Sequence, residues 1–285
     1  MRNIIVTGGN GQLGNAINSI ETEFGNGDNY IYLTAEQLDV TSVDSITEAV
    51  KVHKPFYIVN CAAYTAVDKA ESEKDLAFSI NAAAAENLAI ICKNNSIKLI
   101  HISTDFVFGE TNPLPLTEEM KAVPTSVYGA TKLDGEKLII QHLEEHFIIR
   151  TSWLYSEFQN NFLKTMIRLG NERDELSVVY DQVGTPTYAV DLAGFIMHII
   201  NSDSLAYGVY HYSNEGVASW YDFAYEIFKL NDIKINLKPI TSDKFPTPAK
   251  RPNYSVMSKD KVKEVFGISI NHWMESLANC IKKLN

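Results

Sequence analysis

The chain opens with a short apolar run and a glycine-rich segment directly behind it, and no other feature constrains its fold as strongly. Residues 3–6 are rich in apolar β-branched side chains, which predicts a strand. Gly8, Gly11 and Gly14 follow at intervals of three, and helix-compatible residues 15–17 come next. Such a turn lets a pyrophosphate approach the free N–H groups of the helix. This start of the chain predicts a strand–turn–helix unit that binds a dinucleotide, and a plain βα turn is the alternative. A P-loop is excluded, because the sequence Gly-Lys-Ser/Thr is missing from this segment.

Strand and helix patterns alternate over the first 150 residues, which is typical of a parallel, doubly wound sheet. Ligands of such sheets lie beyond the carboxyl ends of the strands. Thr41 and Asp44 read as a capping box for one of the helices. The expected strands are 3–6, 30–33, 56–60, 98–102 and 147–150, and the expected helices are 42–54, 75–94 and 127–142.

After residue 150 the rhythm changes, and we expect a second, smaller lobe. The overall prediction is an α/β fold: a Rossmann-type doubly wound parallel sheet with a discontinuous C-terminal substrate lobe. Residues 1–152 would form the dinucleotide-binding domain, to which 188–213 returns; 153–187 and 214–285 would form the lobe. The expected elements are helices at 161–169, 191–201, 220–229 and 272 to the end, and strands at 176–180 and 208–213.

The length and charge of the chain limit its function. Its 285 residues allow one large or two modest domains with ample core. Twenty-five basic and 35 acidic side chains give a net charge of −10, whereas a protein that binds a polyanion usually has the opposite balance. We therefore expect no nucleic-acid partner. A single anionic ligand remains compatible, because a helix N-terminus and one or two arginines suffice for it.

Cysteine and histidine usage favours a reduced, cytoplasmic protein without a bound metal. Cys61, Cys92 and Cys280 are odd in number and widely spaced, unlike a disulfide framework or a metal site. His101 lies in an apolar run and reads as a satisfied core residue. The expected strand begins right behind the initial methionine, and no segment approaches 18 apolar residues. We expect neither a signal peptide nor a membrane span.

Tyr128 and Lys132 lie four residues apart within the expected helix 127–142, and therefore on one helix face. A nearby ammonium favours the phenolate, so it lowers the pKa of a tyrosine from its usual value of about 10. Such a tyrosine exchanges a proton with a carbonyl or alcohol oxygen near neutral pH. The spacing alone also fits an ordinary surface helix, so its meaning depends on the other motifs.

Three motifs together make the chain resemble the extended short-chain dehydrogenase/reductases, over essentially all of its 285 residues. They are the glycine turn, Thr104 behind the strand 98–102, and the Tyr128/Lys132 pair. The resemblance implies that the three side chains surround one carbonyl group and that NADPH or NADH is the cofactor. A serine usually takes the place of Thr104, and threonine offers the same hydroxyl.

Five further segments resemble one family, the dTDP-4-dehydrorhamnose reductases, in the same order along the chain. The resemblance implies hydride delivery to C4 of dTDP-4-dehydro-β-L-rhamnose, which gives dTDP-L-rhamnose. Tyr128 would protonate O4, Lys132 would lower the pKa of Tyr128 and bind the nicotinamide ribose, and Thr104 would hold the carbonyl or the phenol. The segments are 60–71, 103–108, 150–155, 181–187 and 246–252.

The family resemblance also implies residues on the cofactor and sugar sides. Arg251 would clamp the diphosphate bidentately, and Trp153 would offer a flat face to the pyranose; a plain surface arginine and a core aromatic are the alternatives. Lys69 and Glu71 read as a solvated charge pair. The cofactor set is Gly8, Gly11, Gln12, Leu13, Gly14, Asp39, Val40, Ala62, Ala63, Tyr64 and Lys132, and the substrate set is Thr65, Val67, Asp68, Thr104, Asp105, Tyr128, Trp153 and Arg251.

The cofactor preference depends on the end of the second strand. An acidic residue there binds the ribose 2′-hydroxyl of NAD and repels the phosphate of NADP. Here that position falls at about Thr34; Glu36 is close by, and no arginine or lysine is near. We expect dual use that favours NADPH. The roles of Asn161 and Phe162, which match a family pair, stay open, as do a homodimer and a divalent-ion requirement.

Two other functions compete with this one. An epimerase or dehydratase of sugar nucleotides shares the superfamily motifs, but dehydratases typically carry an Asp-Glu pair where this chain has Asp105 and Phe106. The regulatory subunit of methionine adenosyltransferase also resembles these reductases and acts as a binding partner. This chain keeps the whole Thr/Tyr/Lys set, which that subunit retains only in part.

Overall fold

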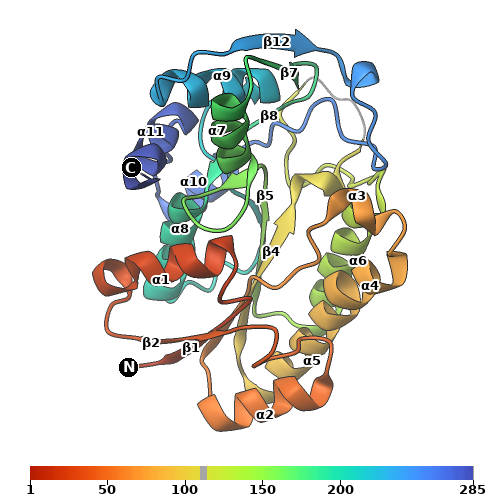
Figure 1. Ribbon diagram of the computed structural model, residues 1–285. Coiled ribbons are helices and arrows are strands. Elements are labelled where there is room, and N and C mark those ends of the chain that lie inside the picture. The colour runs from red at the N-terminus through yellow and green to blue at the C-terminus, as the bar shows by residue number, and fades with distance from the viewer. Residues whose placement is uncertain (110–113, 285) are drawn as a thin grey trace.

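A six-stranded parallel sheet forms the centre of the molecule (Figure 1). The computed structural model describes residues 1–109 and 114–284. The strand order is β10-β5-β4-β3-β1-β2. From β1 the chain first adds β2 on one side and then adds β3, β4, β5 and β10 on the other, so the topological switch point lies between β1 and β3. The predicted Rossmann-type doubly wound sheet is confirmed. The strands are β1 (Asn3–Thr7), β2 (Asn29–Leu33), β3 (Tyr57–Asn60), β4 (Lys98–Thr104), β5 (His146–Thr151) and β10 (Gly208–His211).

Helices cover both faces of the sheet because successive side chains of a strand point to opposite sides. In β1, Ile4 and Val6 pack into one core with α1 (Gln12–Phe24) and α8 (Ala189–Asn201). Ile5 packs into the other core, beneath α2, α5 and α6. The helices of the second face are α2 (Val43–His53), α4 (Lys74–Phe78), the π-helical η1 (Ser79–Ala83), α5 (Ala84–Asn95) and α6 (Val127–His142).

The helix η1 packs closely against α6, and Gly135 makes this contact possible. A Cβ atom at Gly135 would collide with the backbone oxygen of Asn81 and lie 3.3 Å from the Cβ atom of Ala85. The buried Asn81 side chain bonds both the backbone nitrogen and the backbone oxygen of Tyr64, and also Thr131 in α6. The contact therefore holds the segment after β3 in register with α6.

Gly135→Ala is expected to destabilise the fold by about 1–3 kcal/mol, because the backbone of η1 must move to admit the methyl group. Gly194→Ala is the matched control, since a Cβ atom at that position in α8 meets nothing within 4 Å. Helix propensity should make the control about 0.5–1 kcal/mol more stable. Urea unfolding measures both free energies, and equal stabilities of the two variants would contradict the packing argument.

The C-terminal part of the chain forms a lobe above the sheet, as Figure 1 shows, and this lobe has a third core of its own. Tyr155, Phe223 and Trp273 are among its buried side chains. β10 pairs in parallel with β5 and so belongs to the main sheet, while the domain boundaries themselves stay a prediction. The principal elements of the lobe are α7 (Phe162–Glu172), β7 (Glu175–Val179), α9 (Trp220–Leu230), β12 (Asn236–Ile240), α10 (Asp260–Phe266) and α11 (Trp273–Leu284).

Local details differ from the sequence-based expectation at three places. Ser42, not Thr41, caps α2, and its side chain accepts from the nitrogen of Ser45. The helix expected at 75–94 is interrupted by η1. Several short elements lack a pattern long enough to detect; they are α3 (Val67–Ala70), η2 (Asp105–Val107), β6 (Leu154–Tyr155), β8 (Val183–Gly184), β9 (Thr187–Tyr188), β11 (Ala218–Ser219) and η3 (Ser242–Lys244), besides β12 and α10.

One helical stretch in the described part of the chain, Lys74–Asn95, is long and apolar enough to cross a membrane by length and composition alone. The stretch is not an unbroken apolar run, because polar side chains such as Asn81 and Glu86 interrupt it. Half of the stretch is buried inside the fold, where it packs against α6 and β4. A core helix of a globular domain passes the same test, so the stretch is weak evidence for a membrane span.

Candidate active site

A cleft of about 1090 Å³ runs along the carboxyl ends of the strands. Its walls come from both parts of the chain, since the glycine turn and α6 line it from the sheet domain and Trp220 and Arg251 line it from the C-terminal lobe. A cleft at the switch point of a doubly wound sheet is the usual ligand site of this architecture. The cleft is therefore the candidate active site.

The glycine turn at the floor of the cleft has the geometry of a phosphate site. Gly8 has a φ of +61°, and a Cβ atom there would lie 3.0 Å from the backbone nitrogen of Ala62. Gly11 occupies the N-cap of α1 without a side-chain cap, which leaves backbone N–H groups of the first turn available to an anion. A dinucleotide pyrophosphate fits this cradle.

Thr104 and Tyr128 meet where β4 ends and α6 begins. Thr104 is buried, its hydroxyl donates to Oδ1 of Asp105 at 3.1 Å, and it also bonds the Tyr128 phenol. The ring of Tyr128 packs edge-on against Phe106. Ser126 caps α6, since its side chain accepts from the nitrogen of Gly129 at 3.1 Å. The hydroxyl and the phenol thus lie side by side on the cleft wall.

Lys132 is buried although it lines the cleft, with 1% of its surface exposed. Its Nζ donates to the backbone oxygen of Ile102 at 2.7 Å and lies 3.1 Å from Nε2 of His101. Burial lowers the pKa of Lys132 to about 8, and the carboxylate of Glu136 opposes this shift. The side chain is thus held at the base of the cleft by the strand below it.

The pKa of Tyr128 moves in the direction opposite to the expected one. Burial raises the pKa of Tyr128 to about 12; the hydrogen bond with Thr104 lowers it, and the charge of Asp105 raises it. The ammonium of Lys132 is directed instead to Ile102 and His101. The expectation that Lys132 lowers this pKa is therefore not met in this structure, and Tyr128 holds its proton at neutral pH.

Asp105 has a buried carboxylate oxygen that accepts no hydrogen bond from the described residues. The residue is 2% exposed, and its Oδ2 atom has no hydrogen-bond partner among the described residues. Burial raises the pKa of Asp105 to about 6, against the nearby hydroxyls of Ser255 and Thr104, which lower it; of these two, Thr104 lies within hydrogen-bond distance, on Oδ1. Unpaired buried oxygens of this kind are rare in folded proteins. A hydroxyl group of a bound ligand would satisfy it.

The structure gathers most of the predicted residues around the cleft and leaves three off its surface. Gly14 is buried in α1 beneath the glycine turn. The phenol of Tyr64 donates to Glu73 at 2.6 Å, and Asp68 pairs with Arg251. The predicted residues that line the cleft are Gly8, Gly11, Gln12, Leu13, Asp39, Val40, Ala62, Ala63, Thr65, Val67, Thr104, Asp105, Tyr128, Lys132, Trp153 and Arg251.

Arg251 and Asp68 form an ion pair across the mouth of the cleft, with 2.8 Å between the guanidinium and Oδ2. Asp68 also accepts from the backbone nitrogen of Ala249 at 3.2 Å. The pair joins the short helix α3, which follows β3, to the proline-rich C-terminal segment. Arg251 is partly exposed here, so it keeps donor atoms for an anionic ligand while Asp68 fixes its orientation.

An aromatic wall forms the other side of the cleft. Trp153 stacks on Trp220 with 3.6 Å between ring centroids and 7° between planes, and Phe162 packs against Trp220 at 4.7 Å. Trp153 also adopts a φ of +47°, which is uncommon for a bulky side chain. All three rings line the cleft. Sequence reasoning missed Trp220, because no local motif links it to Trp153.

Two further residues support the site: Asn161, whose role the sequence left open, and Glu71. Asn161 caps α7 and donates to the side chain of Gln12 at 2.9 Å, which ties the lobe to the glycine turn. Glu71 accepts from the nitrogen of Val127 at 2.9 Å and so binds the first turn of α6. The reading of Glu71 as part of a solvated charge pair is therefore wrong.

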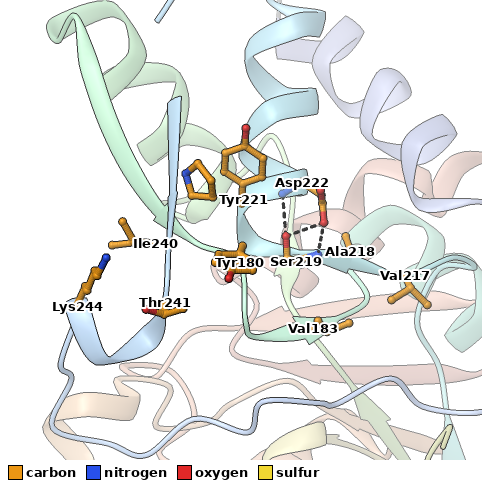
Figure 2. A pocket seen from close by; sticks show the side chains of 11 residues that line it. Tyr180, Val183, Val217, Ala218, Ser219, Tyr221, Asp222, Ile240, Thr241 and Lys244 are labelled. Carbon is orange, nitrogen blue, oxygen red and sulfur yellow. Dashed lines mark hydrogen bonds between the residues drawn. The ribbon is translucent and has the colours of Figure 1, made fainter. Parts of the chain in front are cut away.

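A second cavity, of about 630 Å³, lies in the C-terminal lobe between the start of α9 and the end of β12 (Figure 2). Ser219 and Asp222 line it, and each accepts a hydrogen bond from the other within the capping box of α9. Figure 2 shows Lys244 and Thr241 on the opposite side. Ser219 and Asp222 are thus already paired with each other, and the first cleft remains the candidate active site.

In the described part of the chain, no three histidine, cysteine, aspartate or glutamate side chains come together as metal ligands. Cys61, Cys92 and Cys280 are free thiols. Burial raises the pKa of Cys61 to about 12, so this thiol, which lines the cleft, stays protonated at neutral pH. The lining side chains that can carry charge near neutral pH are therefore Asp39, Asp105, Lys132 and Arg251.

Comparisons with known proteins agree with this geometry. The family model described as RmlD substrate binding domain matches residues 1–285. The dTDP-4-dehydrorhamnose reductase of Aggregatibacter actinomycetemcomitans is 36% identical, over 98% of this chain and 98% of that protein. Crystal structures of the reductases of Clostridium acetobutylicum and, in complex with NADP, Bacillus anthracis superpose with TM-scores of 0.95 and 0.94, at 42% and 39% identity, over 99% of each chain. The chain therefore belongs to this family and is an oxidoreductase of the dTDP-4-dehydrorhamnose reductase type.

Proposed function

We propose that this protein reduces the C4 ketone of dTDP-4-dehydro-β-L-rhamnose with NADPH or NADH, and that Tyr128 donates the proton. The observation that carries the proposal is the meeting of Thr104, Tyr128 and Lys132 on one wall of the cleft, above the glycine turn. A bound nicotinamide would supply the hydride. The protein supplies orientation, a proton and the exclusion of water.

Tyr128 is suited to act as a general acid because it keeps its proton until charge develops on the substrate oxygen. Thr104, bonded to the phenol, would hold the carbonyl oxygen in place, and Lys132 at the base of the cleft would stabilise the phenolate that forms. Asp105 would accept a hydrogen bond from a sugar hydroxyl through its unpaired Oδ2 atom. Arg251 would bind the diphosphate, and the aromatic wall would pack against the sugar or the base.

The direct experiment is to incubate the protein with dTDP-4-dehydrorhamnose and NADPH, and to follow NADPH oxidation and the sugar product. The proposal predicts dTDP-L-rhamnose. If the protein fails to oxidise NADPH with this ketone but does so with another keto-sugar nucleotide, then the proposed substrate is wrong while the reductase chemistry stands.

The cofactor preference gives a separate prediction: NADPH should be used at least as efficiently as NADH, as measured by kcat/KM. Ala35, just after β2, lines the cleft, whereas the exposed Glu36 does not, so no carboxylate repels a 2′-phosphate there. Ala35→Asp should shift the ratio of kcat/KM values towards NADH by about tenfold, and Glu36→Gln is the control that should not. A preference of the parent for NADH of about tenfold or more would contradict the prediction.

A sugar-nucleotide epimerase or dehydratase is the nearest alternative. Such enzymes recycle a tightly held NAD, whereas a reductase must release its oxidised cofactor after each turnover. Purified protein that retains stoichiometric NAD through gel filtration would favour the alternative. Phe106, where dehydratases carry a second acid, packs against Tyr128 and offers no proton. Assembly into a homodimer stays a prediction, which the mass in solution would test.

A further inference from the structure

A row of four buried polar side chains runs beneath the carboxyl edge of the sheet and ends at Lys132. Nζ of Lys132 lies 3.1 Å from Nε2 of His101, and the side-chain amide of Asn60 lies 3.0 Å from Nδ1 of the same ring. The hydroxyl of Thr7 donates to Oδ1 of Asn60 at 2.6 Å. None of the four is more than 2% exposed. The row crosses β1, β3 and β4 and reaches α6.

The hydrogen bonds of this row depend on the charge of Lys132. A neutral imidazole has one donor nitrogen and one acceptor nitrogen, and an ammonium group only donates. When Nδ2 of Asn60 donates to Nδ1 of His101, the single ring proton of the neutral imidazole is on Nε2. Nε2 then donates to Nζ of Lys132, which can accept a hydrogen bond only when the lysine is uncharged. If Lys132 is charged, Nε2 must accept, so Nδ1 carries the proton and needs the amide oxygen of Asn60. A half-turn of the Asn60 amide provides this, because Oγ1 of Thr7 then accepts from Nδ2.

We propose that His101 is a positioning residue of the active site, which stays hydrogen-bonded to Lys132 in both charge states of the lysine through a change of tautomer. Asn60 follows by exchanging its amide oxygen and nitrogen. His101 does not touch substrate or cofactor, and it acts through Lys132 alone. This inference rests on the proposed role of Lys132 in the reduction.

The surroundings keep the imidazole uncharged while Lys132 titrates. Burial, together with the charges of Lys132 and His146, holds the pKa of His101 well below its usual range. Around Lys132, the charged or titratable groups are Cys61, directly after β3, Tyr128 and Glu136 on α6, and His101 on β4. Glu136 is bound by the guanidinium of Arg150 in β5 at 2.7 Å. The row therefore has one group, Lys132, that changes charge near neutral pH.

The position of the ammonium follows from two fixed contacts. One hydrogen of Lys132 goes to the backbone oxygen of Ile102 and a second to His101, so the third is directed towards the cleft. Without the imidazole, the ammonium would rotate or lose a partner in a buried environment, which disfavours its charged form. His101 therefore sets both the direction and the charge of the lysine.

A pair of variants separates positioning from packing. His101→Leu removes the acceptor, and we expect kcat to fall about tenfold or more and the alkaline limb of kcat/KM to move to lower pH. His101→Gln can place its amide oxygen near Nζ and should recover most of kcat and the parent pH profile. His142→Gln is the control: this histidine in the last turn of α6 pairs with Glu86 and not with a member of the row, so its loss should leave the pH profile unchanged. A folded Leu variant with the parent kcat and pH profile would overturn the proposal.

A measurement without turnover tests the tautomer directly. In ¹⁵N-labelled protein, the ring nitrogens of His101 should report a proton on Nδ1 well below the pKa of Lys132, which is about 8, and on Nε2 well above it. Lys132→Met should abolish the change. One unchanging tautomer across this range would refute the proposal even in an active enzyme. If the tautomer changes but the protein reduces no keto-sugar, then the proposed function fails and the pairing of His101 with Lys132 stands.

Discussion

Tyr128→Phe is expected to lower kcat by at least about a hundredfold and to leave KM for the sugar nucleotide nearly unchanged, because it removes the proton donor but keeps the ring. The remaining ring would still pack against Phe106, so the fold should be preserved. Steady-state kinetics with NADPH and the ketone gives both constants. Circular dichroism and thermal unfolding establish that the variant is folded.

Tyr30→Phe is the control for this substitution. Tyr30 is a buried tyrosine of β2 whose hydroxyl has no hydrogen-bond partner among the described residues, so its removal should change neither kcat nor stability by much. A Tyr128→Phe enzyme with turnover close to the parent would remove Tyr128 from the acid role. Thr104 would then be the hydroxyl to test next, because it bonds the same phenol.

Lys132→Met is expected to lower kcat/KM by at least about a hundredfold without lowering stability at pH 7. The substitution removes the charge that would stabilise the phenolate and the contact that would orient the cofactor. It also removes a charge that the fold buries at a penalty. The pKa of Lys132 falls from the usual 10.5 to about 8, which corresponds to about 3 kcal/mol against the folded state. The lost bond to the oxygen of Ile102 offsets about 1–3 kcal/mol of the gain.

The pH dependence of unfolding identifies the same lysine. Between about pH 8 and 10.5 the unfolded chain binds more protons than the folded one, so Lys132 makes the parent more stable as pH rises through this window. Below pH 8 the whole penalty applies. In Lys132→Met this rise should disappear. Guanidinium unfolding at several pH values measures it, and identical slopes for parent and variant would show that Lys132 is not a buried charge.

Much of the fold could be predicted because its signals are local. The strand–glycine–helix start and the helix at 127–142 were found because hydrophobic periodicity and turn residues repeat within a few positions. The elements that were missed, such as β12 and α10, are short or exposed and leave no comparable pattern. The π-helical turn η1 was not predicted for a different reason. Its sequence is equally compatible with a regular α-helix, and its close packing against α6 is a tertiary contact that the local sequence does not reveal.

The sequence by itself determined which residues the site is built from, because Thr104, Tyr128 and Lys132 belong to short motifs read along the chain. Only the tertiary structure decided what those residues experience. Burial raises the pKa of Tyr128, against the expected direction. Lys132 contacts His101, which is 31 residues away in the sequence, and His101 contacts Asn60, a further 41 residues away. Desolvation and long-range hydrogen bonds depend on which segments the fold brings together, and no spacing within one segment encodes them.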